Sequence, residues 1–151
     1  MKPMEIVVLG TSAMVPTKDR NQSAVLLRHG QEGLLFDCGE SVQKQLQIVG
    51  IPANRITRIF LTHWHGDHTL GLPGLLQTIS AQTPGASITV YGPRNTKEKI
   101  RALLEVFEFH QRLNLRVEEI NGGVILETDD FFVEAKMLEH GIPCLGYAFV
   151  E

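Results

Sequence analysis

The sequence has little that would build a disulfide framework, cross a membrane or attract a polyanion over its whole surface. It contains only two cysteines, Cys38 and Cys144, and both lie in apolar surroundings, so we expect reduced thiols in a cytoplasmic compartment. No apolar run approaches the ~18–20 residues of a membrane span, which argues against a membrane partner. The net charge of −3 provides no general attraction to nucleic acid, so any such contact must come from local basic patches.

The remaining composition is that of an ordinary globular domain. Hydrophobic residues make up 43% of the 151 residues and charged residues 21%. A chain of this length can bury about 68–70% of its unfolded surface. We therefore expect one domain over residues 1–151, without repeats or linkers.

Hydrophobic periodicity and turn residues predict the secondary structure. The expected strands are 4–9, 24–28, 34–37, 56–61, 88–91, 113–120, 123–127, 131–137 and 145–150. The expected helices are 40–49, 69–82 and 96–109, with Gly50 ending the first of them. Mostly antiparallel strand neighbours with interspersed helices indicate an α+β or mixed α/β layer pattern.

The most informative stretch is His63-Trp64-His65-Gly66-Asp67-His68, which offers three imidazoles and one carboxylate within six residues. It lies between an apolar strand and the start of a helix. His63 and His65 are two apart and can point the same way. Asp67 and His68 are adjacent, and we expect their side chains to diverge. One loop could therefore supply two metal positions.

Three other histidines and one aspartate need separate interpretation. His140 lies on a turn after a strand and is the next candidate ligand, although an ordinary loop histidine is the alternative. His29 in a hairpin turn and His110 at a helix end are expected to be exposed to solvent. Asp37 ends a buried strand. It either caps the following helix or accepts a hydrogen bond from a metal-ligating imidazole, and we favour the second role.

A dinuclear site for phosphoryl chemistry holds two divalent ions ~3.5–4 Å apart. His63, His65 and His140 can furnish one ion, and Asp67 with His68 part of a second. The second ion is then one protein ligand short, and no bridging carboxylate is assigned. After His140 only Glu151 could contribute.

The motif His-x-His-x-Asp-His resembles the metal signature of the metallo-β-lactamase superfamily. Further blocks, in order along nearly the whole chain, make the sequence similar to the ribonuclease Z family, whose members trim the 3′ end of precursor tRNA. These blocks are 9–13, 15–17 with Arg20 and Asn21, 35–40 with Gln43, Gln45 and Leu46, 71–76, 91–93, and His140 with Gly146 and Tyr147. The departures are Ser41-Val42 where the family often has Gly-Thr, and Trp64 where it often has Leu; none is a ligand position.

The resemblance implies an α+β fold, the N-terminal half of an αββα sandwich with one mixed sheet and flanking helices. Family members continue past the position of Glu151 with a tRNA-binding arm, the bridging Asp and the last ligand His, so we expect a complementary C-terminal half. It also implies a homodimer formed through the helices that start near Glu40 and Thr69.

The resemblance further implies roles for individual residues. One ion would be held by His63, His65 and His140, and a second by Asp67 and His68. Zinc is the expected metal, two ions per complete site, although Mn²⁺ or Fe²⁺ can also occupy a His/Asp site. Asp67 would also be the general base.

A polar loop is the expected substrate contact. Lys18, Arg20 and Asn21 would face the RNA 3′ end, or else form a solvated loop.

Three functions stay open on the sequence alone. The leading one is a metal-dependent hydrolase, an endoribonuclease that removes the 3′ trailer of precursor tRNA. The second is another phosphodiesterase of the same fold that acts on small phosphodiesters. The third is a half-domain that binds zinc or a partner chain without catalysis.

Overall fold

The computed structural model describes residues 3–151, so residues 1 and 2 of the expected domain lie outside it. The strands are β1 (Met4–Gly10), β2 (Ala24–His29), β3 (Glu32–Phe36), β4 (Arg58–Phe60), β5 (Ser87–Gly92), β6 (Asn114–Glu119), β7 (Gly123–Glu127), β8 (Phe132–Leu138) and β9 (Cys144–Val150). The helices are α1 (Val42–Ile48), the short 3-10 helix η1 (Ala53–Arg55), α2 (Gly66–Thr69), α3 (Leu72–Gln82) and α4 (Thr96–Glu105). None of these helices is long and apolar enough to cross a membrane.

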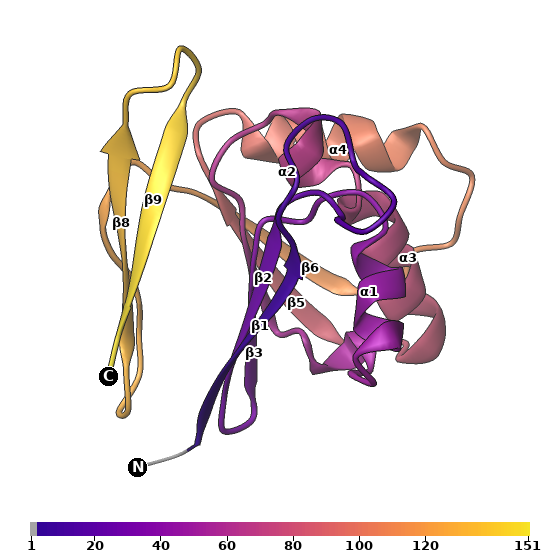
Figure 1. The fold of residues 1–151 in the computed structure, drawn as a ribbon, viewed down its shortest axis with the longest axis horizontal. Helices are drawn as coiled ribbons and strands as arrows, with labels where there is room; N and C mark the ends of the chain where they lie inside the picture. Colours follow the sequence, from indigo (N-terminus) through magenta and orange to yellow (C-terminus); the bar gives the residue numbers. More distant parts are fainter. Residues whose placement is uncertain (1–2) are drawn as a thin grey trace.

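Strands β1 to β6 form one mixed sheet in sequence order. Strands β1, β2 and β3 pair antiparallel, whereas β3, β4, β5 and β6 pair parallel. The parallel half requires crossover connections, which α1, α3 and α4 supply. Figure 1 shows these helices on one face of the sheet.

Both faces of this sheet are buried at its centre, because neighbouring residues of a strand point to opposite sides. Ile59 packs with the helices and Phe60 packs on the other face. The pairs Leu26–Leu27, Leu34–Leu35 and Val90–Tyr91 divide in the same way. Continuous apolar strand sequences are therefore explained by burial on both faces.

The second face is covered by a separate antiparallel sheet of β7, β8 and β9. Val133 of β8 and Phe131 pack against Leu27, Phe60 and Tyr91 of the first sheet. The expected α+β class, with a mixed sheet and flanking helices, is confirmed. The structure adds that helices cover one face only and that a second sheet covers the other.

The parallel pairing brings three chain segments to one edge. Asp37 follows β3, the histidine loop follows β4, and Pro93 follows β5. The second sheet is tied to the same edge because Leu145 N–H donates to the Thr62 carbonyl at 2.8 Å and the Tyr147 hydroxyl donates to the Leu61 carbonyl at 2.8 Å. Ligands of open α/β sheets bind at such carboxyl ends.

Two helices differ from the sequence prediction. The helix expected over 69–82 is interrupted at Gly71, whose N–H donates to the Cys38 carbonyl at 2.9 Å. A Cβ at this position would lie 2.0 Å from the Gly39 carbonyl oxygen, so only glycine allows this contact. The helix expected over 96–109 ends at Glu105, where β-branched and aromatic residues of lower helix propensity begin.

The expectation that His29 is exposed is wrong. Its side chain is 2% exposed and lies between the sheets. The ring makes an edge contact with Phe131, with centroids 5.3 Å apart, and its Nε2 lies 3.2 Å from Glu151 Oε1. The second sheet buries this hairpin residue, which the local sequence does not indicate. Glu151 is therefore placed beside His29, at the end of β9 remote from His140.

Helix α1 offers a matched test of the core. Leu46 is 1% exposed and Ile48 is 66% exposed. We expect Leu46→Ala to lower the free energy of unfolding by about 2–5 kcal/mol because it leaves a cavity. At dilutions where the chain is monomeric, Ile48→Ala should cost about 0.5 kcal/mol or less. Urea unfolding followed by circular dichroism measures both, and equal losses would contradict the placement of α1.

Candidate metal centre

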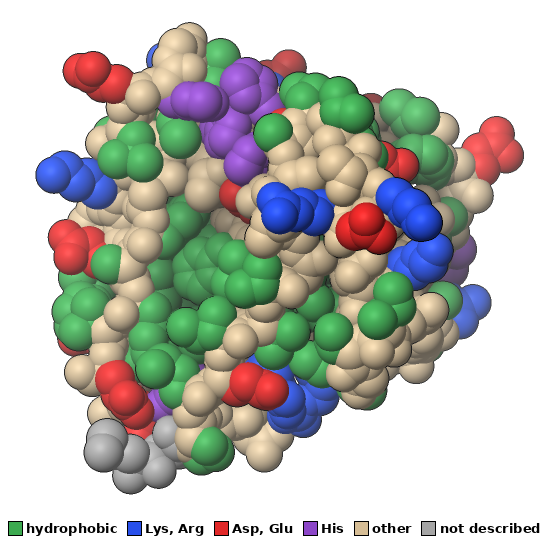
Figure 2. Space-filling view, viewed as in Figure 1, with side chains coloured by type: hydrophobic (Ala, Val, Ile, Leu, Met, Phe, Trp, Pro, Cys, Tyr) green, Lys and Arg blue, Asp and Glu red, His purple; other side chains and the backbone are tan. Residues whose placement is uncertain are grey.

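Three imidazoles converge at one end of the molecule. His63 and His65 come from the loop between β4 and α2, and His140 comes from the turn between β8 and β9. One ring nitrogen from each lies within 4.8 Å of the others, and His63 Nε2 is 3.0 Å from His65 Nδ1. Figure 2 shows the histidines gathered there. This set of nitrogens is suited to a divalent ion such as zinc.

A second pair of donors lies beside this cluster. His68 lies on α2, and its ring centroid is 4.1 Å from that of His63. Its Nε2 is 3.5 Å from Asp67 Oδ2. The expected divergence of Asp67 and His68 is therefore wrong, because their side chains approach each other at the start of α2. The loop still presents two adjacent donor groups.

Asp37 is buried beneath both groups. Its Oδ2 lies 2.6 Å from His68 Nδ1, and its Oδ1 accepts the Thr62 N–H at 2.8 Å. It does not cap α1, whose N-cap is Ser41. Of the two roles open from the sequence, the geometry matches the acceptor of an imidazole N–H.

Thr62 is a participant that sequence reasoning missed. Its hydroxyl lies 3.0 Å from Asp37 Oδ1 and 2.8 Å from His63 Nδ1. If the hydroxyl donates to the carboxylate, it accepts from His63 Nδ1–H and leaves a lone pair on Nε2. By the same logic His68 Nδ1–H donates to Asp37 and leaves its Nε2 free. Both free nitrogens then face the donor cluster. The only sequence signal was the position of a hydroxyl residue directly before the first histidine.

The environment shifts the titration of two histidines in opposite directions. Burial lowers the pKa of His63 to about 4, and the neighbouring imidazoles of His68 and His140 add to this. The hydrogen bond to Asp37 raises the pKa of His68, because the carboxylate stabilises the protonated ring. His63 is thus neutral, the form that binds metal, at ordinary pH.

One atom of the site has no partner among the described residues. Asp67 Oδ1 is buried and makes no hydrogen bond. An unpaired buried carboxylate oxygen is costly, and a cation beside it would remove the cost. Together with the three converging imidazoles, this orphaned oxygen fits a divalent metal.

The loop with Lys18, Arg20 and Asn21 lies beside the same edge. The Asn21 amide donates to the Glu40 carbonyl at 2.9 Å, so this side chain holds the loop against the start of α1. Lys18 and Arg20 are exposed. A Cβ on Gly39 would meet both Gln22 and the Asp67 carbonyl oxygen, which places the end of this loop next to the donor cluster.

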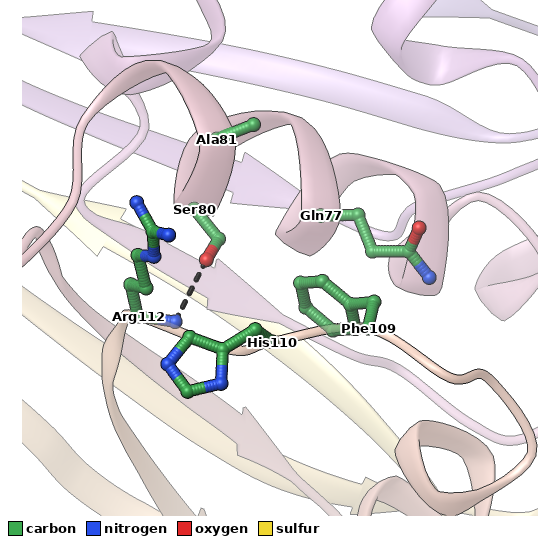
Figure 3. A pocket seen from close by; sticks show the side chains of 6 residues that line it. All are labelled: Gln77, Ser80, Ala81, Phe109, His110 and Arg112. Atoms are coloured by element: carbon green, nitrogen blue, oxygen red, sulfur yellow. Dashed lines mark hydrogen bonds between the residues drawn. The ribbon is translucent and has the colours of Figure 1, made fainter.

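A different hollow lies away from the histidines, on α3 and the segment after α4 (Figure 3). There the Arg112 N–H donates to Ser80 Oγ at 2.8 Å, and His110 is exposed, as expected. In residues 3–151, the only group of three or more possible ligand residues whose atoms lie within 4.8 Å is His63, His65 and His140.

The model of the "Metallo-beta-lactamase superfamily" matches residues 17–144. The chain belongs to the metallo-beta-lactamase superfamily. Among its relatives in this superfamily, Ribonuclease Z of Bacillus cereus strain G9842 is 47% identical over 152 aligned positions, covering 98% of this chain and 50% of that protein. Ribonuclease Z of Bacillus mycoides is 46% identical with the same coverage. The chain thus spans about half the length of these curated relatives.

Solved structures of the superfamily superpose on the fold of this chain. Human tRNase Z, short form, superposes with a TM-score of 0.86 at 37% identity, covering 97% of this chain and 64% of that chain. The metallo-beta-lactamase fold protein YhfI of Bacillus subtilis superposes with a TM-score of 0.81 at 21% identity, covering 99% and 58%, a likeness of fold alone.

The cluster can be tested by metal content. We expect His65→Ala to lower the zinc bound per chain, because it removes one of three converging nitrogens. His110→Ala is the matched control, since this exposed imidazole lies outside the cluster. Elemental analysis after dialysis measures both. Unchanged zinc in the His65 variant would show that the metal binds elsewhere.

Proposed function

We propose that this chain is the metal-binding half of an endoribonuclease that removes the 3′ trailer of precursor tRNA by phosphodiester hydrolysis. The observation that carries the proposal is the donor cluster itself, set in a chain 47% identical to Bacillus cereus Ribonuclease Z over 98% of its length. The structural likeness to human tRNase Z supports the same substrate class.

Under this proposal His63, His65 and His140 hold one ion, and Asp67 with His68 contributes to a second. We propose zinc as the metal, with Mn²⁺ or Fe²⁺ able to occupy the same donors. Bound ions would polarise the phosphoryl group and acidify a water molecule.

The chain's own residues do the rest. We propose that Asp67 Oδ1 accepts a proton from the attacking water, which is supported by its burial without a hydrogen-bond partner among residues 3–151. Asp37 positions His68 directly and His63 through Thr62.

Substrate contact is proposed for the loop beside the cluster. Lys18 and Arg20 are exposed and form no ion pair among residues 3–151, so both can neutralise RNA phosphates. Asn21 acts through its bond to the Glu40 carbonyl, which fixes the loop. A cytoplasmic location is also proposed, on the two buried free thiols and the tRNA substrate.

A complementary half is the proposed partner, and an exposed apolar face of the first sheet supports this. Met4, Ile6 and Val8 of β1 pair with His29, Leu27 and Val25 of β2, so they face the side of the second sheet. They are nevertheless 50–60% exposed. Figure 2 shows hydrophobic side chains in a hollow between the sheets. A further strand beside β9 would cover this face.

A homodimer is proposed through another surface. Ile48 and Val49 at the end of α1 and Leu70 after α2 are exposed, large and apolar. Figure 1 shows α1 on the helical side of the first sheet, opposite the second sheet. We propose that these exposed apolar side chains take part in the subunit contact.

The function is tested by two substrates in parallel. We expect the isolated chain to bind at most one ion tightly and to show little cleavage of precursor tRNA, because the second donor group has only two side chains. Hydrolysis of a small chromogenic phosphodiester without tRNA cleavage would instead favour a small-substrate phosphodiesterase. Robust tRNA cleavage with two metals per chain would refute the expected incompleteness. Zinc binding with neither activity, even after a complementary half is added, would support the non-catalytic alternative.

The complementary half is tested by binding. We expect the part of Bacillus cereus Ribonuclease Z that this chain does not match to form a 1:1 complex with it in sedimentation. Ile6→Asp should weaken the complex at least about tenfold, since it places a charge in an apolar contact. Val106→Asp, at another exposed β-branched apolar residue, should not. Equal affinities of the two variants, or no complex at all, would overturn the proposed contact surface on β1. Sedimentation of the chain alone measures whether it forms a homodimer.

A further inference from the structure

A groove of about 280 Å³ opens directly beside the histidine cluster. It is lined by the histidine loop, by the segment between β5 and α4, by the first turn of α4 and by the turn between β8 and β9. His65 belongs both to the groove and to the donor cluster. A substrate strand that crosses the cluster would therefore continue into this groove.

The charged side chains that line the groove are all positive. Arg94 and Lys99 line it, and no carboxylate does. Both cations are exposed, and neither forms an ion pair within residues 3–151. By contrast, Arg101 of the same helix is within ion-pair distance of Glu105. Two unpaired cations in a concave site attract a phosphate.

Trp64 forms the inner wall. Its indole N–H donates to Thr96 Oγ1 at 2.9 Å, which fixes the ring, and Lys99 Nζ lies 5.3 Å from the ring centroid. Ile142 and Pro143 supply further apolar lining. An aromatic platform combined with cations is the arrangement that binds single-stranded nucleic acid, where bases stack and phosphates are neutralised.

We propose that this groove holds the nucleotide next to the scissile phosphate of an RNA strand. Its base or sugar lies against Trp64, and its phosphate lies between Arg94 and Lys99. These residues are positioning residues, because they lie outside the donor cluster. The inference rests on the proposed function and adds to it a binding site on the strand's path.

The chain carries its own reporter for this site, because Trp64 is its only tryptophan. A short single-stranded RNA with a fluorescent label is titrated with the zinc-loaded chain. Label anisotropy reports binding anywhere, and tryptophan emission reports occupancy of the groove. We expect both signals to change with the same midpoint.

Paired variants separate this groove from general charge. Arg94→Ala with Lys99→Ala should raise the Kd about tenfold and lower the slope of log K against log salt by about 0.7, the value for one phosphate of a single strand. Lys97→Ala with Arg101→Ala removes the same charge from α4 outside the groove and should change neither. Zinc content should stay the same in both.

The outcomes are distinct. RNA binding without a change in tryptophan emission, or equal loss of affinity in both double variants, would overturn the groove and leave the proposed function standing. No RNA binding by anisotropy would overturn the groove as well, while the tRNA cleavage assay would decide the function separately.

Discussion

The Asp37 carboxylate is the interaction on which the site depends. It is buried and takes hydrogen bonds from the Thr62 backbone and hydroxyl, and it meets the His68 ring at 2.6 Å. It fixes His68 directly and, through Thr62, the tautomer of His63. Asp37 itself has a φ of 58°, a left-handed conformation that aspartate tolerates better than most residues. The backbone holds it there, since Asp37 N–H donates to the Phe60 carbonyl at 2.9 Å.

Parallel pairing explains why the candidate functional side chains lie together at one edge of the first sheet. Strands β3, β4 and β5 end at the same edge, so the residues after them meet although they are distant in sequence. The loop after β4 supplies His63 and His65, and the loop after β5 supplies Arg94. The second sheet adds His140 from the opposite side. It is held there because the Leu145 N–H of β9 donates to the Thr62 carbonyl in the loop after β4. The donor cluster therefore lies at the interface between the two sheets.

The sequence predicted what local spacing determines. The His-x-His-x-Asp-His spacing indicated a donor cluster, and apolar runs indicated strands close to those observed, although not their division into two sheets. What it could not predict depends on contacts between distant segments. His29 is buried only because the second sheet lies over β2, and the helix expected from residue 69 breaks because Gly71 packs on Gly39. Thr62 could not be assigned because its role arises from Asp37, 25 residues away.

Under the proposed function, one missing partner explains both the exposed apolar face of β1 and the incomplete ligand set of the second ion. Met4, Ile6 and Val8 are exposed on the inner side of the first sheet, and the second sheet stops at β9, which pairs with no further strand among the described residues. The hollow between the sheets ends at the histidines in Figure 2. A single added layer beside β9 would bury the apolar face and reach the donor cluster as well. Burial of that face would supply the driving force for assembly, and the same layer could contribute the ligands that Asp67 and His68 lack. Binding of the partner would then bury the apolar face and complete the ligand set of the second ion in the same step.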